Sequence, residues 1–76
     1  MITLRDIAPD RTVTTIKVLG SGKLRKRLLD MGLTKGTEIY VKKVAPLGDP
    51  IEISLRGYDL SLRKDEAAFI QVIELR

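Results

Sequence analysis

The sequence predicts an all-β fold, a small barrel of about five strands with one short helix inserted after the first strand. Five stretches are rich in β-branched residues or alternate between apolar and polar residues, which is typical of strands with one buried face. The 76 residues suffice for one domain, and a barrel leaves few strand edges exposed. The expected strands cover residues 12–19, 37–44, 51–56, 59–63 and 69–75.

A short leading segment precedes the first expected strand. Leu4 and Ile7 lie three residues apart in this segment, so both are expected to anchor it to the core. A turn is expected at residues 8–11. In the strand that follows, Ile16 and Val18 alternate with polar neighbours, which predicts that both side chains face the core.

One amphipathic helix is expected directly after the first strand. Ser21 suits the N-cap position, because its hydroxyl can accept a hydrogen bond from a free backbone N–H group. Leu24, Leu28 and Met31 then recur with helical spacing and form one apolar stripe. Gly32 is expected to end the helix, because glycine adopts left-handed backbone conformations without a Cβ penalty.

The second half of the chain consists of short strands joined by turns. Residues 46–50 combine two prolines with a glycine, a composition typical of turns. A hairpin reversal is expected at residues 57–58, and residues 64–68 suit a single helical turn. Asp65 and Glu66 are more consistent with the exposed start of that turn than with a cation site. One early helix and one late helical turn favour an SH3-like barrel over an OB-fold.

Composition and charge narrow the classes of function. The chain has 14 lysines and arginines, 10 acidic residues, a net charge of +4, and no cysteine or histidine. These two absences exclude disulfides, thiolate or imidazole metal ligands, and catalytic sites built on Cys or His. Residues 17–43 hold eight cationic and two acidic side chains. This segment is expected to attract anionic partners or anionic lipid headgroups.

Several familiar binding signals are incomplete or missing. Residues 20–23 read Gly-Ser-Gly-Lys, but the earlier glycine of a phosphate-binding loop is missing and Leu24 replaces the magnesium-binding hydroxyl residue. The basic run 23–27 lacks the interleaved aromatic residues with which small barrels stack nucleic acids. No apolar run approaches the ~20 residues of a membrane span, and no leader pattern opens the chain, so a soluble cytoplasmic protein is expected.

Five short motifs follow one another in a fixed order along the chain. They are LLDMGLTKG (28–36), VAPLGDP (44–50), IEI (51–53), RGY (56–58) and LSLR (60–63). Together they resemble the FeoA family of small cytoplasmic proteins of ferrous iron uptake, and the likeness extends from about Thr3 to the C-terminus. The resemblance implies one domain over residues 1–76 with an SH3-like barrel and an inserted helix. Asp10 departs from the pattern, since relatives often have glycine there.

The resemblance also implies a function. Such proteins are accessory partners of the membrane transporter FeoB, whose cytoplasmic GTPase domain they contact. The chain is therefore expected to be a non-enzymatic interaction module, without cofactor or metal, that modulates transport and is recruited to the inner face of the membrane. One alternative is a regulator of the transporter's GTPase cycle, with Arg25, Arg27 or Arg56 as an arginine finger. A second alternative is a small barrel that binds nucleic acid. Weak self-association of the chain is left open.

Six residues are candidates for contact with the transporter. Leucines near a helix corner and in a turn belong to the core by default, but one or two of them can be left exposed as a docking patch. Basic residues of the helix would steer an anionic partner towards that patch. The candidates are Leu29, Leu33 and Leu47 as the apolar patch, with Lys23, Lys26 and Arg27 as the basic residues.

Overall fold

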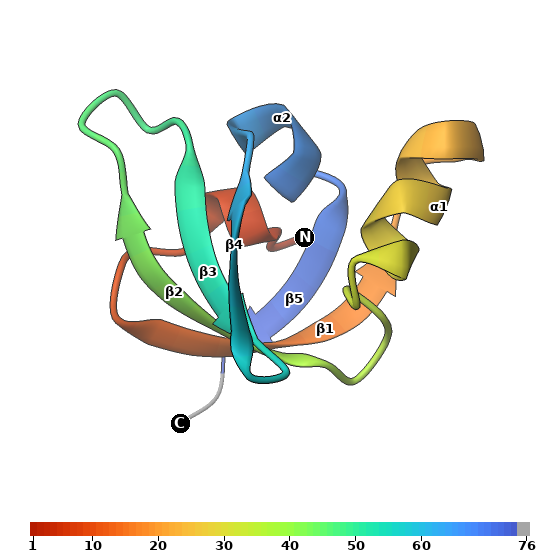
Figure 1. Ribbon diagram of the computed structural model, residues 1–76, viewed down its shortest axis with the longest axis horizontal. Helices are drawn as coiled ribbons and strands as arrows, with labels where there is room; N and C mark the ends of the chain where they lie inside the picture. Colours follow the sequence, from red (N-terminus) through yellow and green to blue (C-terminus); the bar gives the residue numbers. More distant parts are fainter. Residues whose placement is uncertain (75–76) are drawn as a thin grey trace.

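One curved antiparallel sheet, with strands in the order β4-β3-β2-β1-β5, makes up most of the fold (Figure 1). The computed structural model describes residues 1–74, so Leu75 of the expected last strand lies outside the described residues. The elements are the 3₁₀ helix η1 (Leu4–Asp6), β1 (Arg11–Val18), α1 (Gly22–Asp30), β2 (Glu38–Val44), β3 (Ile51–Leu55), β4 (Tyr58–Leu62), α2 (Lys64–Ala67) and β5 (Ile70–Glu74). The expected all-β class, with five strands and a helix after the first, is confirmed.

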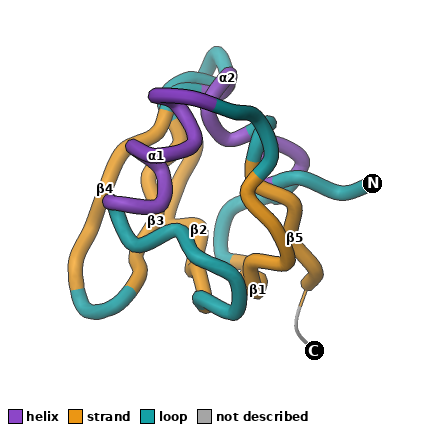
Figure 2. The backbone as a smooth tube through the Cα atoms, turned by 90° about the vertical axis from the view of Figure 1, so that its right-hand side faces the viewer, coloured by secondary structure: helices purple, strands orange, loops and turns teal. Residues whose placement is uncertain are grey.

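The sheet is not closed into a complete barrel. Its edge strands β4 and β5 form no ladder with each other within residues 1–74. Instead α1 lies over the opening between them (Figures 1 and 2). Tyr58 of β4 donates a hydrogen bond to the carbonyl of Met31, and Nε of Arg25 donates to the carbonyl of Val18 in β1 at 3.3 Å. The expected barrel is therefore an open sheet whose opening is covered by a helix.

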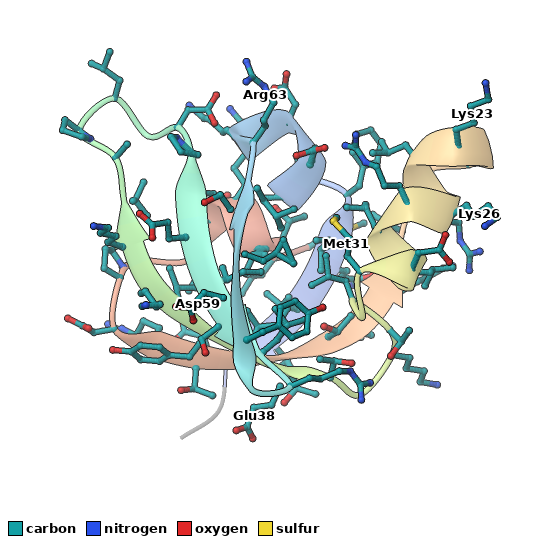
Figure 3. The ribbon with its side chains drawn as sticks, viewed as in Figure 1. Lys23, Lys26, Met31, Glu38, Asp59 and Arg63 are labelled. Carbon is teal, nitrogen blue, oxygen red and sulfur yellow. The ribbon has the colours of Figure 1, made fainter. Side chains whose placement is uncertain are left out.

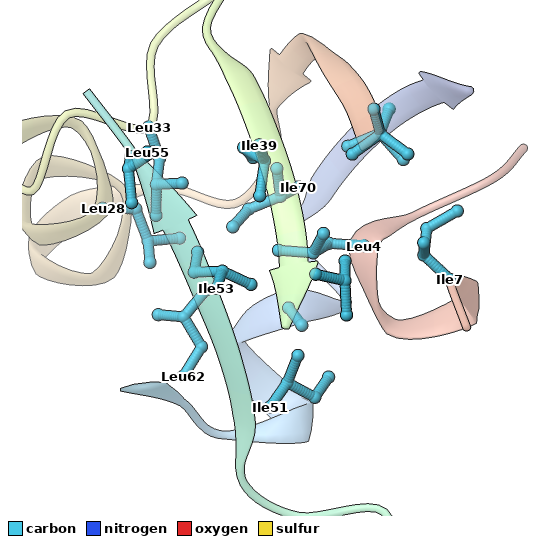
Figure 4. Packing of buried hydrophobic residues seen from close by; sticks show 14 of the residues in the cluster. Leu4, Ile7, Leu28, Leu33, Ile39, Ile51, Ile53, Leu55, Leu62 and Ile70 are labelled. Atoms are coloured by element: carbon cyan, nitrogen blue, oxygen red, sulfur yellow. The ribbon is translucent and has the colours of Figure 1, made fainter. Parts of the chain in front are cut away.

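The inward face of the sheet, the leading segment and the α1 region share one hydrophobic core (Figure 4). Strands β2 and β3 bury alternate residues, as their sequence pattern predicts. Leu4 and Ile7 are 0% and 4% exposed, which confirms that they anchor the leading segment. The core consists of Leu4, Ile7, Val13, Val18, Leu28, Leu33, Ile39, Val41, Ile51, Ile53, Leu55, Leu62, Ala67, Ile70 and Val72.

A β-bulge changes which side chains of β1 are buried. Thr15 and Lys17 pair with consecutive residues of β5, so β1 carries one extra residue between them. Val13 and Thr15 alternate into the core, which leaves Ile16 38% exposed, and the extra residue then returns Val18 to the core. The expectation that Ile16 is buried is therefore wrong, whereas Val18 is buried as expected.

Strands β3 and β4 are joined by the two-residue turn Arg56-Gly57. Leu55 pairs directly with Tyr58, so the reversal lies one residue earlier than expected. The φ angles of Arg56 and Gly57 are 47° and 85°, the positive values that tight hairpin turns with primed geometry require. A non-glycine residue is strained in this region of backbone space, so the arginine at position 56 needs a compensating interaction.

Candidate functional site

The corner that follows α1 has the geometry of a Schellman helix end. Gly32 has a φ of 95°, and its N–H donates to the carbonyl of Leu29 at 3.0 Å. The N–H of Leu33 donates to the carbonyl of Leu28 at 3.1 Å, and both of these leucines are fully buried. Gly32 thus ends the helix as expected. The chain turns back at this point with Leu33 packed into the core.

Arg56 holds this corner against the β3–β4 hairpin. Its Nη2 donates to the hydroxyls of Thr34 at 3.0 Å and Thr37 at 2.8 Å, and its Nε donates to the carbonyl of Gly32 at 3.3 Å. The hydroxyl of Thr37 also bonds the carbonyl of Gly32, at 3.1 Å. These contacts join residues about twenty positions apart and explain why a long cationic side chain occupies a turn position that favours glycine.

We expect two replacements of Arg56 to differ in stability. Arg56→Ala removes the three contacts and keeps a side chain at positive φ, so it should lower the free energy of unfolding by about 2 kcal/mol. Arg56→Gly loses the same contacts but relieves the backbone, and should be about 1 kcal/mol more stable than Arg56→Ala. Urea unfolding of both variants measures the difference, and equal stabilities would contradict a strained turn held by its side chain.

Opposite charges connect α1 to α2. Arg27 forms an ion pair with Glu66, whose side chain is only 16% exposed and also accepts the N–H of Arg63 at 2.9 Å. The expected helical turn at residues 64–68 is therefore confirmed as α2, with Glu66 facing inward rather than towards solvent. A cavity of about 410 Å³ adjoins α1 here, lined by Leu24 with Lys23 and Arg27.

The other two basic candidates point away from the body of the protein. Figure 3 shows Lys23 and Lys26 on the outer side of α1. Lys26 bonds Asp30 one helical turn later, at 3.0 Å between Nζ and Oδ2, and both side chains remain largely exposed. Such an exposed pair contributes little to stability. Lys23 forms no ion pair within the part of the chain that the structure describes, so its charge is available to a partner.

The loop between β2 and β3 presents Leu47 to solvent. Leu47 is 92% exposed, the highest value among the large apolar side chains of the described residues. The loop is nonetheless ordered by its own backbone, since Gly48 N–H donates to the carbonyl of Ala45 at 2.7 Å. Asp49 accepts the first backbone N–H of α2, that of Lys64, at 3.0 Å. A fixed loop with an apolar tip is well suited to contact another molecule.

The three candidate leucines therefore do not form one patch. Leu33 is 0% exposed, so the expectation of an exposed side chain there is wrong, because the Schellman turn directs it into the core. Leu29 is half-buried and packs against the core. Leu47 is exposed, but its loop lies across the molecule from α1, with α2 between them (Figure 1).

The sequence patterns did not predict that the side chains of Ile16 and Ile73 are exposed.

The three arginines considered for an arginine finger already have partners. Arg25 donates to the carbonyl of Val18, Arg27 is paired with Glu66, and Arg56 holds the corner. Each would have to leave these contacts to reach a nucleotide bound by another protein. None of these three guanidinium groups is therefore free for that role in this structure.

Paired side chains balance the charge on the outer face of β2 and β4. Nζ of Lys42 donates to Oδ2 of Asp59 at 2.7 Å, which lowers the pKa of Asp59 and raises the pKa of Lys42 from their ordinary values. The hydroxyl of Tyr40 donates to Asp10 at 2.6 Å, and this bond raises the pKa of Tyr40. Asp10 has a φ of 66°, a conformation that also suits the glycine expected there.

The described residues lack two further kinds of feature, a membrane-spanning helix and an acidic metal site. No helix in residues 1–74 has the length and apolar character of a membrane-spanning segment. The same residues contain no group of three or more Asp and Glu side chains arranged to hold a metal ion.

Comparison with known proteins assigns the family. A family model described as the FeoA domain matches residues 2–74. The chain belongs to the FeoA family. The resemblance of the sequence motifs is thereby confirmed, and it covers nearly all of the chain.

Solved structures of FeoA proteins share the fold. An FeoA-like protein from Clostridium acetobutylicum is 45% identical, with a TM-score of 0.92 over 99% of this chain and 87% of that one. Stenotrophomonas maltophilia FeoA, described as an SH3 domain protein, is 22% identical, with a TM-score of 0.86 over 96% of this chain and 91% of that one. At that identity the second comparison shows the fold alone, and the expected SH3-like fold is confirmed.

A longer relative contains an FeoA-like region as part of a fusion. The chain is 44% identical over 57 residues to the Fe(2+) transport protein A/Fe(2+) transporter FeoB fusion protein of Porphyromonas gingivalis. The match covers 75% of this chain and 7% of that protein, so this FeoA-family chain corresponds to a small part of its relative.

Proposed function

We propose that this FeoA-family chain is an accessory protein of ferrous iron uptake that binds the cytoplasmic part of the FeoB transporter. The observation that carries the proposal is the Porphyromonas gingivalis relative, in which the two proteins share one polypeptide. Fusion keeps two domains at a high effective concentration, which favours a contact of modest affinity between them. A separate chain would make the same contact at a lower effective concentration.

The proposed role is non-enzymatic modulation of transport. The chain acts in the cytoplasm and reaches the inner face of the membrane through the transporter, whose GTPase domain is the surface it contacts. Histidine and cysteine are missing from the sequence, so nucleophile–base pairs that need either residue are excluded. A docking module needs only a shaped surface, and the ordered loop around Leu47 supplies one.

Leu47 is the proposed apolar anchor of this contact. Its side chain is 92% exposed, and its loop is held by backbone hydrogen bonds, so docking would order few additional groups. Burying an exposed leucine contributes about 1.5–3 kcal/mol. Leu29 contributes only the exposed part of its side chain. Leu33 has no place in the contact, because it is in the core.

The basic residues of α1 are proposed to act over a longer range. Lys23, Lys26 and Arg27 keep exposed side chains on α1, even though two of them also form ion pairs. Charges of this kind raise the rate of association with an acidic surface and lose this effect as salt screens them. We therefore assign them to steering rather than to tight contact.

Equilibrium binding to the cytoplasmic portion of FeoB from the same organism tests the proposal. We expect saturable binding at or below tens of micromolar at low salt, and about tenfold weaker binding for Leu47→Ala. The matched control is Ile73→Ala, which also truncates an exposed apolar side chain but lies on β5, and it should bind within about twofold of the unmodified chain.

Two results would count against this proposal. Absence of saturable binding, both to the cytoplasmic portion and to the complete transporter at low salt, would remove the partner. Equal losses for Leu47→Ala and Ile73→Ala would keep the partner but remove the loop as its anchor. Circular dichroism of both variants shows whether either change has disturbed folding.

A further inference from the structure

Unbalanced positive charge gathers on the side of the molecule that α1 covers. The solvent-facing surface of α1 carries four cationic residues and one acidic residue, Asp30. Lys17 on β1 and Lys35 in the corner add to this charge, and both are exposed without an ion pair in residues 1–74. The cationic residues of α1 are Lys23, Arg25, Lys26 and Arg27.

Hydrogen bonds bring these separate segments together. Gly36 N–H donates to the carbonyl of Thr15 at 2.7 Å, which places Lys35 beside the part of β1 that carries Lys17. Arg25 donates to the carbonyl of Val18, so the helix lies against the end of the same strand. Lys17, Arg25 and Lys35 therefore belong to one continuous surface.

The remaining cations on the sheet are mostly neutralised. Lys42 of β2 pairs with Asp59 of β4 at 2.7 Å, across β3, and Lys43 pairs with Glu52 of the neighbouring strand β3 at 3.5 Å. Arg11 is likewise paired, with Glu74 of β5 at 2.8 Å. Among the cations of the sheet and of α1, only Lys17, Lys23 and Arg25 lack an ion pair within residues 1–74, and all three lie on the α1 side.

We infer that the α1 side of this protein binds the surface of an anionic lipid bilayer. The apolar residues of α1 point inward, with Leu28 fully buried and Leu24 and Leu29 packed against the core, so the helix has little to insert into hydrocarbon. Binding would be electrostatic and reversible, as for basic surfaces on anionic leaflets. It requires no transporter and is separate from the function proposed above.

A nucleic acid fits this surface less well than a bilayer does. Single strands are bound by aromatic side chains on which successive bases stack. No aromatic residue lies within α1, and the hydroxyl of Tyr58 is bonded to the Met31 carbonyl. A bilayer needs only the charges. It also leaves the Leu47 loop free, because that loop and α1 lie on opposite sides of the fold (Figure 1).

Vesicle sedimentation of the complete chain, without transporter, tests this inference. We expect binding to vesicles that contain phosphatidylglycerol, none to vesicles of pure phosphatidylcholine, and release at about 1 M salt, where the Debye length is about 3 Å. The double variant Lys17→Gln/Lys23→Gln should bind about thirtyfold more weakly, since each surface cation contributes about a fivefold gain. Both residues are exposed and outside the core, so folding should be unaffected.

The matched control removes two cations from other faces. Arg5→Gln/Lys43→Gln has the same net charge as the test variant, and both residues are exposed. We expect it to bind within about threefold of the unmodified chain. Equal losses for the two variants, binding to pure phosphatidylcholine, or no binding to phosphatidylglycerol would overturn the inference. Displacement from the vesicles by duplex DNA at equal phosphate concentration would overturn it in favour of a nucleic acid.

Discussion

Replacing Leu33 by alanine is expected to lower the free energy of unfolding by about 3 kcal/mol. Leu33 is 0% exposed and packs with Leu28 in the Schellman corner, so truncation leaves a cavity that its tightly packed neighbours cannot fill. A 76-residue domain has a total stability of roughly 4–11 kcal/mol. The variant would therefore lose a large fraction of its stability.

Leu47→Ala is the matched control for this result. It makes the same chemical change at a side chain that is 92% exposed, and its effect on the free energy of unfolding should stay within about 0.5 kcal/mol. The midpoints of urea unfolding give both values. Similar small effects for the two variants would show that Leu33 is not in the core and would return it to the docking surface.

The second large effect is expected at Gly32. Its φ of 95° excludes ordinary side chains, and a Cβ atom would lie 3.0 Å from the hydroxyl of Tyr58 and 3.3 Å from Cδ of Arg56. Neither neighbour can move freely, because Tyr58 bonds the Met31 carbonyl and Arg56 holds the corner. Gly32→Ala should therefore lower the free energy of unfolding by about 3 kcal/mol, combining backbone strain with a steric conflict.

Gly36→Ala separates these two causes. Gly36 has a φ of 86°, and no atom lies within 4 Å of the position that its Cβ would take. Gly36→Ala should lower the free energy of unfolding by the backbone strain alone, about 1–2 kcal/mol. Thermal or urea unfolding of the pair measures the difference. If Gly32→Ala lowers the free energy of unfolding no more than Gly36→Ala does, the hairpin does not pack as closely on the corner as Tyr58 and Arg56 indicate.

Local patterns predicted the elements of this fold well. The alternation of Ile51, Ile53 and Leu55 defined β3, and a glycine after an apolar stripe defined the end of α1. These features depend on neighbours within a few residues. The exposure of Ile16 beside the buried Val18 could not be predicted in the same way, because the bulge exists only in the pairing of β1 with β5.

The candidate site shows more clearly that local sequence patterns do not reveal tertiary contacts. Leu33 follows the glycine that ends a helix and Leu47 lies in a proline-rich turn, but neither pattern alone says whether the leucine is buried. Tertiary structure buries the first and exposes the second. The role of Arg56 also depends on tertiary contacts, since its partners lie at Gly32, Thr34 and Thr37. The family could be identified from motifs, but the surface that it presents could not.

We propose that the partner binds the Leu47 loop, that the basic residues of α1 steer it there, and that the helix corner serves the fold. Titration of the isotopically labelled chain with the cytoplasmic portion of FeoB, followed by amide NMR, tests it most directly. We expect saturable shifts at Leu47 and Gly48, with the amides of Leu33 and Thr37 unchanged. Shifts confined to β1 and β5 around Ile16 and Ile73, or no saturable shift at all, would contradict the claim.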